Sequence, residues 1–289
     1  MAEYVLFTDS TTDLPVELVQ EMQVEVMPLV FTLGGKNYRN SPDNRELSPK
    51  EFYDRLRAGE VSTTSQINQA DFLDTFTPVL EQGKDILYLA FSSGLSGTFN
   101  SARLAAEDLR EQFPERTIEV IDTLQASMGE GLAVYYAACL KNEGKSLREV
   151  ADWFVENRQS ICAWFTVDDL MFLKRGGRVS GAAAVAGTLL GIKPVLHVDE
   201  EGKLIPMEKV RGRRASLDAL VKHFAASTYD RSKQVVFVSH GDCLEDCQYV
   251  ADKIAALGVK RVCISTIGPV IGAHSGPGTV ALFFRAEKR

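Results

Sequence analysis

The run FSSGLSGT at residues 91–98 contains the side chains best placed to hold a ligand. It follows a predicted strand at 86–91 and precedes a helical pattern in which apolar residues recur every three or four positions up to residue 113. Ligands bind at such strand–helix junctions in open α/β sheets, because helix N-termini present unpaired N–H groups. Ser92, Ser93, Ser96 and Thr98 would add hydroxyl donors for an anion. An ordinary helix cap with a tight glycine turn explains the same run equally well.

Ser96 also permits a nucleophile hypothesis, because a serine between strand and helix is typical of α/β-hydrolases. The candidate base is His274, the one histidine of four that lies in a glycine-rich, loop-like run, at 272–278. The hydrolase elbow requires a second glycine where this sequence has Thr98. A serine hydrolase that acts on an acyl ester through Ser96 and His274 is therefore the alternative function.

Two further types of polar cluster, a run of hydroxyl residues and two basic runs, can be explained either by a structural role or by a ligand site. The hydroxyl run at 62–65 precedes a helical pattern formed by Phe72, Phe76 and Leu80, and capping of that helix explains it adequately. The basic runs at 174–178 and 209–214 would be solvated faces, phosphate contacts or a docking surface for an acidic partner.

No motif indicates a metal or a nucleotide held by this chain itself. His240, Cys243 and Cys247 lack the further ligands of a closed tetrahedral shell, and both cysteines belong to an apolar helical stripe. The sequence contains neither GxxxxGK[ST] nor GxGxxG after the first strand. We expect no metal and no cofactor.

The order of predicted elements indicates an α/β fold in two parts. Short apolar runs at 4–8, 24–33, 86–91 and 118–121 alternate with helical patterns, which predicts a mostly parallel sheet. In the second half, runs at 194–198 and 203–210 flank the turn DEEG and predict a β-hairpin, hence antiparallel pairing. We predict an N-terminal α/β domain at 1–160 and a C-terminal α+β domain at 161–289, with a crevice between them.

Composition narrows the possible environments and partners. The chain has 289 residues and a net charge of −7, from 32 Lys+Arg and 39 Asp+Glu, so no broad nucleic-acid surface is expected. Five scattered cysteines suit a reducing compartment. The first residues lack secretory features, and the weakly polar stretch at 179–192 is shorter than the roughly 20 residues of a membrane helix. We therefore expect a cytoplasmic protein without stable membrane insertion.

Taken in order along the chain, several short motifs resemble those of the DegV family. They are FTDSTTDL at 7–14, TSQ at 64–66, SSGLSGT at 92–98, VIDT at 120–123, KRGGR at 174–178, IKP at 192–194 and AHSG at 273–276. The resemblance runs nearly from end to end. One departure is Ile67, which stands where family members commonly have proline after TSQ.

The resemblance implies a DegV-like two-domain protein that holds one long-chain fatty acid in a buried tunnel between its domains. Thr64 and Ser96 would hydrogen-bond the carboxylate with His274 beside them, and Ser65, Ser93, Gly97 and Thr98 would complete the ligand site. Arg178 and Arg211 would meet a phosphate or a partner near the tunnel mouth. The small-residue stretch at 182–190 would line the tunnel. The better-understood members are non-catalytic, acyl-carrying subunits of bacterial fatty acid kinase, so ATP would come on a separate subunit.

Overall fold

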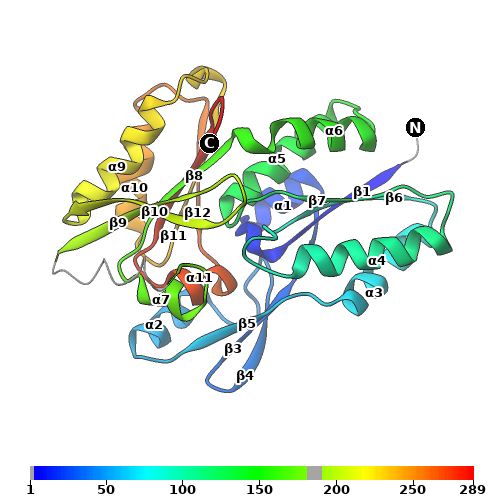
Figure 1. The fold of residues 1–289 in the computed structure, drawn as a ribbon, viewed down its shortest axis with the longest axis horizontal. Helices are drawn as coiled ribbons and strands as arrows, with labels where there is room; N and C mark the ends of the chain where they lie inside the picture. The colour runs from blue at the N-terminus through cyan, green and yellow to red at the C-terminus, as the bar shows by residue number, and fades with distance from the viewer. Residues whose placement is uncertain (1–2, 181–190) are drawn as a thin grey trace.

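The computed structural model describes residues 3–180 and 191–289, and within them the chain forms a layered α/β structure (Figure 1). Two sheets stand on either side of a central helical layer, and each sheet carries further helices on its outer face. The stretch at 182–190, predicted to line a tunnel, lies outside the described residues. None of the helices described is both long and apolar enough to span a bilayer.

The first sheet is parallel throughout, as the alternation of strands and helices predicted. Its order is β2-β1-β6-β7, with β1 (Tyr4–Asp9), β2 (Glu25–Met27), β6 (Asp85–Ala90) and β7 (Ile118–Asp122). Helices α3 (Gln69–Glu81) and α4 (Thr98–Gln112) cover one face, and α1 (Val16–Met22), α5 (Met128–Asn142) and α6 (Leu147–Asn157) cover the other. The apolar spacing that predicted α4 buries Ala102, Ala106 and Leu109 completely.

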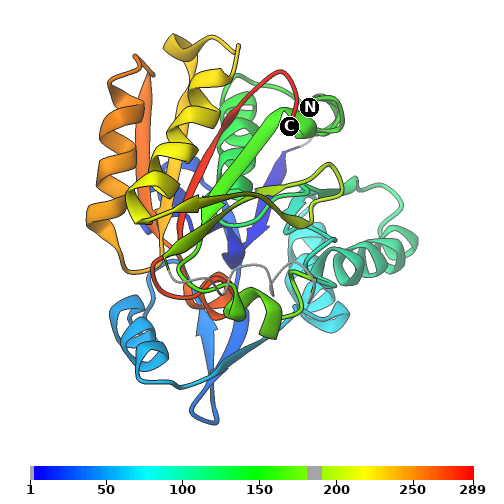
Figure 2. The ribbon, with the colours of Figure 1, turned by 60° about the vertical axis from the view of Figure 1, so that its left-hand side comes forward.

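The second sheet is largely antiparallel, as the predicted hairpin required. Its order is β10-β9-β8-β13-β11-β12, with β8 (Ile161–Thr166), β9 (Ile192–Val198), β10 (Leu204–Arg211), β11 (Val235–His240), β12 (Arg261–Thr266) and β13 (Val280–Arg285). Only the β11–β12 pair is parallel. Helices α9 (Arg213–Ala226) and α10 (Leu244–Ala255) pack on its outer face, at the left of Figure 2.

A third, small antiparallel sheet was not predicted. It has the order β4-β3-β5, with β3 (Leu29–Leu33), β4 (Lys36–Asn40) and β5 (Ser62–Ser65). The predicted single strand at 24–33 breaks at Pro28, because proline has no N–H for a sheet, and only β2 joins the parallel sheet. The hydroxyl run at 62–65 is strand β5 and not a helix cap; Asn68 caps α3, in a capping box with Asp71.

The remaining helices in the described ranges are short. They are α2 (Pro49–Arg57), α7 (Met171–Arg175) and α11 (Pro269–Ser275), with the 3-10 turns η1 (Ser10–Thr12), η2 (Arg158–Ser160) and η3 (Arg231–Lys233). The turns η1 and η2 lead directly out of β1 and into β8, respectively, and α11 immediately precedes the turn into β13.

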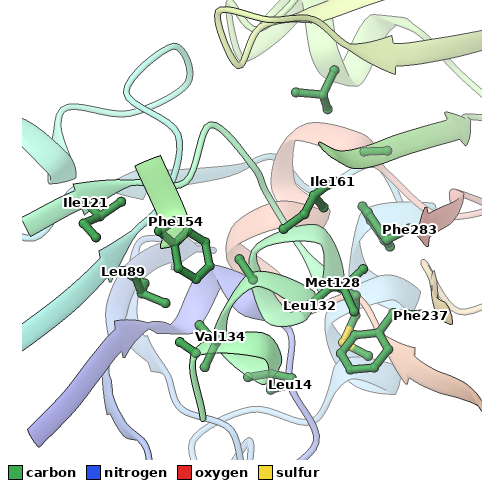
Figure 3. Close-up of a cluster of buried hydrophobic side chains, with 14 of the residues drawn as sticks. Leu14, Leu89, Ile121, Met128, Leu132, Val134, Phe154, Ile161, Phe237 and Phe283 are labelled. Carbon is green, nitrogen blue, oxygen red and sulfur yellow. The ribbon is translucent and has the colours of Figure 1, made fainter. Parts of the chain in front are cut away.

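The central helix α5 packs against both large sheets. Figure 3 shows Leu132 between Leu89 of the parallel sheet and Phe237 of the antiparallel sheet. These side chains belong to one continuous buried cluster, to which residues on both sides of position 160 contribute. The domain boundary at 160 stays a prediction, and the two sheets share their largest core.

Candidate functional site

A cavity of about 390 Å³ lies against β8 and β13 of the antiparallel sheet, where these strands face the loop after β6, strand β5 and helix α11. Its volume falls within the range of roughly 300–1,000 Å³ that is usual for small-molecule sites. Most of its wall is apolar: Leu29, Phe91, Leu95, Ala126, Ala163, Phe165, Leu173, Val198, Leu204, Ile267, Val270, Ile271, Ala281 and Phe283. Such a wall suits a hydrocarbon chain, because burying apolar surface is favourable.

The polar part of the wall brings together residues far apart in the sequence. Thr64 of β5 and His274 of α11 are joined by a hydrogen bond of 2.8 Å between Oγ1 and Nε2. Pairing of Thr64 with Phe31 of β3 fixes the register of β5. Thr64 is half-buried, while Thr63 beside it is exposed. Ser65, Ser96, Gly97 and Arg178 also line the cavity, so six of the predicted site residues meet there.

His274 lies in a helix, which corrects the loop-like setting that its glycines indicated. Helix α11 begins with Pro269 in its first turn and ends at Gly276, whose φ is +78°. Proline at the start and glycine after the end are standard helix signals, and they were present in the sequence. The backbone of Gly176 approaches His274 so closely that a Cβ there would collide with Nδ1. Position 176 therefore has no room for a side chain, and the imidazole ring is held by its hydrogen bond to Thr64.

The electrostatics of this polar end keep His274 neutral. Burial, together with the nearby positive charge of Arg178, lowers the pKa of His274 to about 4. Arg178 is itself half-buried and donates from Nε to the carbonyl of Leu95 at 3.2 Å and from Nη1 to the carbonyl of Gly176. Burial lowers the pKa of its guanidinium. Among the described residues, the polar end thus presents the cation Arg178 and neutral hydrogen-bonding groups.

The loop before α4 supplies Ser96 through an internal hydrogen-bond network. Ser96 Oγ accepts from the backbone N–H of Thr98 at 3.2 Å and lies 3.0 Å from Thr98 Oγ1. Thr98 is buried beneath Ser96, and the exposed Ser93 donates its N–H to Asp122 at 3.2 Å. Neither Ser93 nor Thr98 is among the residues that line the cavity. The structure therefore places both behind or beside the wall.

The start of this loop is anchored by a buried aspartate in the first motif. Asp9 accepts from the Phe91 N–H at 3.2 Å and from the Tyr88 hydroxyl at 2.7 Å. Burial raises the pKa of Asp9, while these hydrogen bonds act in the opposite direction. The motif at 7–14 thus positions the wall of the cavity, although Asp9 does not line it.

The two predicted basic contacts lie in different settings. Arg178 lines the cavity, whereas Arg211 is exposed on β10 opposite Ile192, at the end of the hairpin away from its turn. Arg213 is paired with Asp246 at 2.8 Å, and Arg214 lies 3.7 Å from the centre of the Tyr249 ring. Part of the second basic run is therefore engaged within the protein.

The geometry does not assemble a hydrolase triad. His274 Nε2 is paired with Thr64, and Ser96 is paired with Thr98. Within the described part of the chain, His274 Nδ1 is buried without a partner, so no carboxylate there orients the ring. A Ser–His–acid mechanism requires such an orienting group.

Several wall residues were not identified from the sequence. Ala163 and Phe165 of β8, and Ala281 and Phe283 of β13, face the cavity and the central helix. Their two-residue spacing is the available signal, because alternate side chains of a strand share a face. That spacing does not tell which face meets a cavity and which meets a helix.

The fold and the cavity together define a mixed α/β protein with a largely apolar pocket that has one polar end. The sequence model of a protein family described as uncharacterised, the DegV family, matches residues 4–287. The chain therefore belongs to the DegV family. A DegV domain-containing protein of Clostridium perfringens is 43% identical over all of this chain and 99% of its own length.

Solved structures agree with this assignment. A DegV family protein from Thermus thermophilus, described by its fatty acid binding, has a TM-score of 0.89 and 35% identity, with 99% of this chain and 100% of that chain covered. DegV of Bacillus subtilis, described as a fatty acid binding protein, has a TM-score of 0.86 and 28% identity over 99% and 100% of the two chains.

Proposed function

We propose that this protein binds one long-chain fatty acid, with the chain in the apolar part of the cavity and the carboxylate at Thr64, Ser96 and His274. The observation that carries the proposal is a largely apolar cavity with the Thr64–His274 pair in its wall. The fatty acid binding described for the Thermus thermophilus and Bacillus subtilis relatives supports it.

The energetics suit this ligand. Each buried methylene contributes about 0.8 kcal/mol, so an alkyl chain of about fourteen methylenes supplies on the order of 11 kcal/mol before ordering costs. The carboxylate must be compensated when it leaves water. If His274 Nε2–H donates to Thr64 Oγ1, the Thr64 hydroxyl is free to donate to the carboxylate, and Arg178 supplies a nearby positive charge.

We further propose that the bound acid is presented to a separate ATP-dependent kinase subunit. A carboxylate oxygen would attack the γ-phosphorus of ATP, so that an acyl phosphate forms and the bond to ADP breaks. This chain has no phosphate-binding loop, so the partner would bring the nucleotide. Arg178 and Arg211 would contact the transferred phosphate or the partner. On this proposal the protein is a cytoplasmic, non-catalytic lipid carrier.

Native mass spectrometry of the gently purified protein tests the binding proposal. The expected result is one added mass of a long-chain fatty acid per chain, or uptake of oleate or palmitate by delipidated protein. A folded protein that carries no acyl chain and takes none up would contradict it. Labelling of Ser96 by a fluorophosphonate, lost in Ser96→Ala, would favour the hydrolase instead.

Arg178→Met, with Arg175→Met as its matched control, tests the kinase step. Arg175 is exposed on the preceding helix and does not line the cavity. In a reaction with ATP and a fatty acid kinase ATP-binding subunit, Arg178→Met should lower acyl phosphate formation at least about tenfold at equal acyl loading. Equal rates for the two variants would remove Arg178 from the phosphoryl-transfer proposal.

A further inference from the structure

A second cavity of about 390 Å³ lies apart from the acyl site. It is formed by the segment from η1 to α1, the segment from β4 to α2, and the end of β12 with the turn that follows it. Its polar wall includes Ser10, Thr12, Asp13, Asn40, Ser265 and Thr266. None of the described residues that line it is Lys, Arg or His.

The wall contains a buried acceptor that lacks a donor. Asn40 is only 5% exposed, and its Nδ2 donates to the carbonyl of Ser10 at 3.2 Å. This bond fixes the orientation of the amide, because a flipped amide would place two oxygens against each other. Asn40 Oδ1 then has no hydrogen-bond partner in the part of the chain that the structure describes. Leaving a buried polar atom unpaired costs about 1–3 kcal/mol.

A carboxylate lies beside this acceptor. Asp13 Oδ1 accepts from the Gly268 N–H at 2.8 Å, and Asp13 Oδ2 accepts from Ser127 Oγ at 2.5 Å. A Cβ at Gly268 would lie 2.9 Å from both Asp13 Oδ1 and Asn40 Oδ1, so these two acceptors lie close to each other beside the Gly268 backbone. Both hydrogen bonds to Asp13 come from neutral groups, and burial raises the pKa of Asp13 to about 8, so at neutral pH the carboxyl is ionised chiefly when a cation binds beside it. A cationic N–H donor that reaches both acceptors from the cavity would compensate the ionised form of Asp13 and pair Asn40.

The other wall residues indicate the charge and the apolar part of the ligand. Glu17 adds a second, exposed carboxylate at the rim, whereas Asp43 is already paired with Arg45 at 2.7 Å. The negative charges of these side chains would repel an anionic ligand. Apolar surface comes from Leu14, Pro15, Val16, Pro42, Pro49 and Ile264. We propose that this cavity binds a small organic cation with N–H donors, a primary amine or guanidine on a short alkyl stem, through Asn40, Asp13 and Glu17.

Calorimetry with putrescine and agmatine as probes, at low ionic strength, tests the site. Choline is the chemical control, because its quaternary nitrogen has no N–H to give Asn40. We expect saturable binding of at least one probe and none of choline. Asn40→Leu should weaken binding about tenfold or more, as expected when a buried hydrogen bond to a charged donor is removed.

A pair of exposed variants keeps the test valid if Asn40→Leu fails to fold. Glu17→Lys and Glu21→Lys make the same charge reversal on helix α1, but only Glu17 lines the cavity. We expect Glu17→Lys alone to weaken binding several-fold. Absence of binding for both probes, equal binding of choline, or equal effects of the two variants would overturn the proposal. None of these results bears on acyl binding in the first cavity.

Discussion

At the scale of single residues, Thr64 and His274 stand 210 positions apart and meet through one hydrogen bond of 2.8 Å. Neither side chain carries a charge, since burial and Arg178 hold the pKa of His274 near 4. The carboxylate proposed here would therefore receive its direct hydrogen bonds from neutral groups. Such bonds leave a carboxylate oxygen less tightly clamped than a bidentate arginine would, which suits a group that must react.

Thr64→Val should weaken fatty acid binding about tenfold. The change keeps the shape of the side chain and removes the hydroxyl, and a hydrogen bond to a charged group contributes about 1.5–3 kcal/mol. The matched control is Thr63→Val on the exposed face of the same strand. Dissociation constants from a fluorescent fatty acid displacement assay would check this. Equal affinities for the two variants would exclude Thr64 as a ligand to the carboxylate.

His274 should make stability depend on pH in the acid range. Its pKa of about 4 in the folded protein lies below the ordinary 6.5, so between these values the unfolded chain binds the extra proton. The contribution of neutral His274 to the free energy of unfolding is complete above pH 6.5. It is lost as the pH falls toward 4, by roughly 1 kcal/mol per pH unit.

Urea unfolding of wild type and His274→Asn at pH 7.5 and pH 5 measures this contribution. The difference in free energy of unfolding, wild type minus variant, should be smaller at pH 5. Other titrating groups, including the raised carboxyls, are common to both proteins and cancel in the difference. A difference that does not change with pH would show that His274 titrates normally in the folded protein.

At the scale of elements, the β9–β10 hairpin packs its turn against the loop that carries Ser96. Ser92 Oγ donates to the carbonyl of Gly202 at 2.8 Å. Gly202 has a φ of +73°, and a Cβ there would collide with Ser92 Oγ and lie 3.0 Å from Leu124 Cα. The contact leaves no room for a side chain at position 202. The hairpin turn therefore helps to position the loop that carries Ser96.

Gly202→Ala should both destabilise the protein and speed exchange of the bound acyl chain. Strain at positive φ costs about 1 kcal/mol, and displacement of Ser92 adds to it. Gly35→Ala is the control, since Gly35 has a φ of +76° in another hairpin and nothing within 4 Å of its added Cβ. Thermal unfolding and acyl exchange rates distinguish the two: only Gly202→Ala should change exchange. Similar acyl exchange rates in both variants would show that the hairpin turn does not affect the ligand site.

The elements also show which features a sequence reveals. Helix α4 and the β9–β10 hairpin were predictable, because apolar spacing and a charged glycine turn are local signals. Strand β5 was not, since its four hydroxyl residues form a strand only by pairing with β3. The same holds for the site: the residues at its polar end carry recognisable chemistry, whereas its apolar wall looks like any other core.

At the scale of the whole molecule, helix α5 joins the two large sheets into one structural unit. Its residues Met128, Leu132 and Val134 are fully buried in a cluster that continues into both sheets. Phe165 and Phe283 belong both to this cluster and to the wall of the first cavity, so the wall depends on how the antiparallel sheet packs on α5. Loss of one sheet would expose the core of the other, which opposes independent unfolding of the two halves.

The two tryptophans allow this to be measured, because Trp153 lies on α6 beside the parallel sheet and Trp164 lies on β8 of the antiparallel sheet. Trp164→Phe leaves Trp153, whose fluorescence reports α6 and its contact with Arg285 of β13, and Trp153→Phe leaves Trp164, which reports the antiparallel sheet. We expect each urea curve to coincide with that of circular dichroism on the same variant. Adding Leu132→Ala should lower stability by about 2–5 kcal/mol in both backgrounds, because it leaves a cavity in the shared core. Curves that separate, or a shift confined to one tryptophan, would show instead that the halves at 1–160 and 161–289 unfold as independent domains.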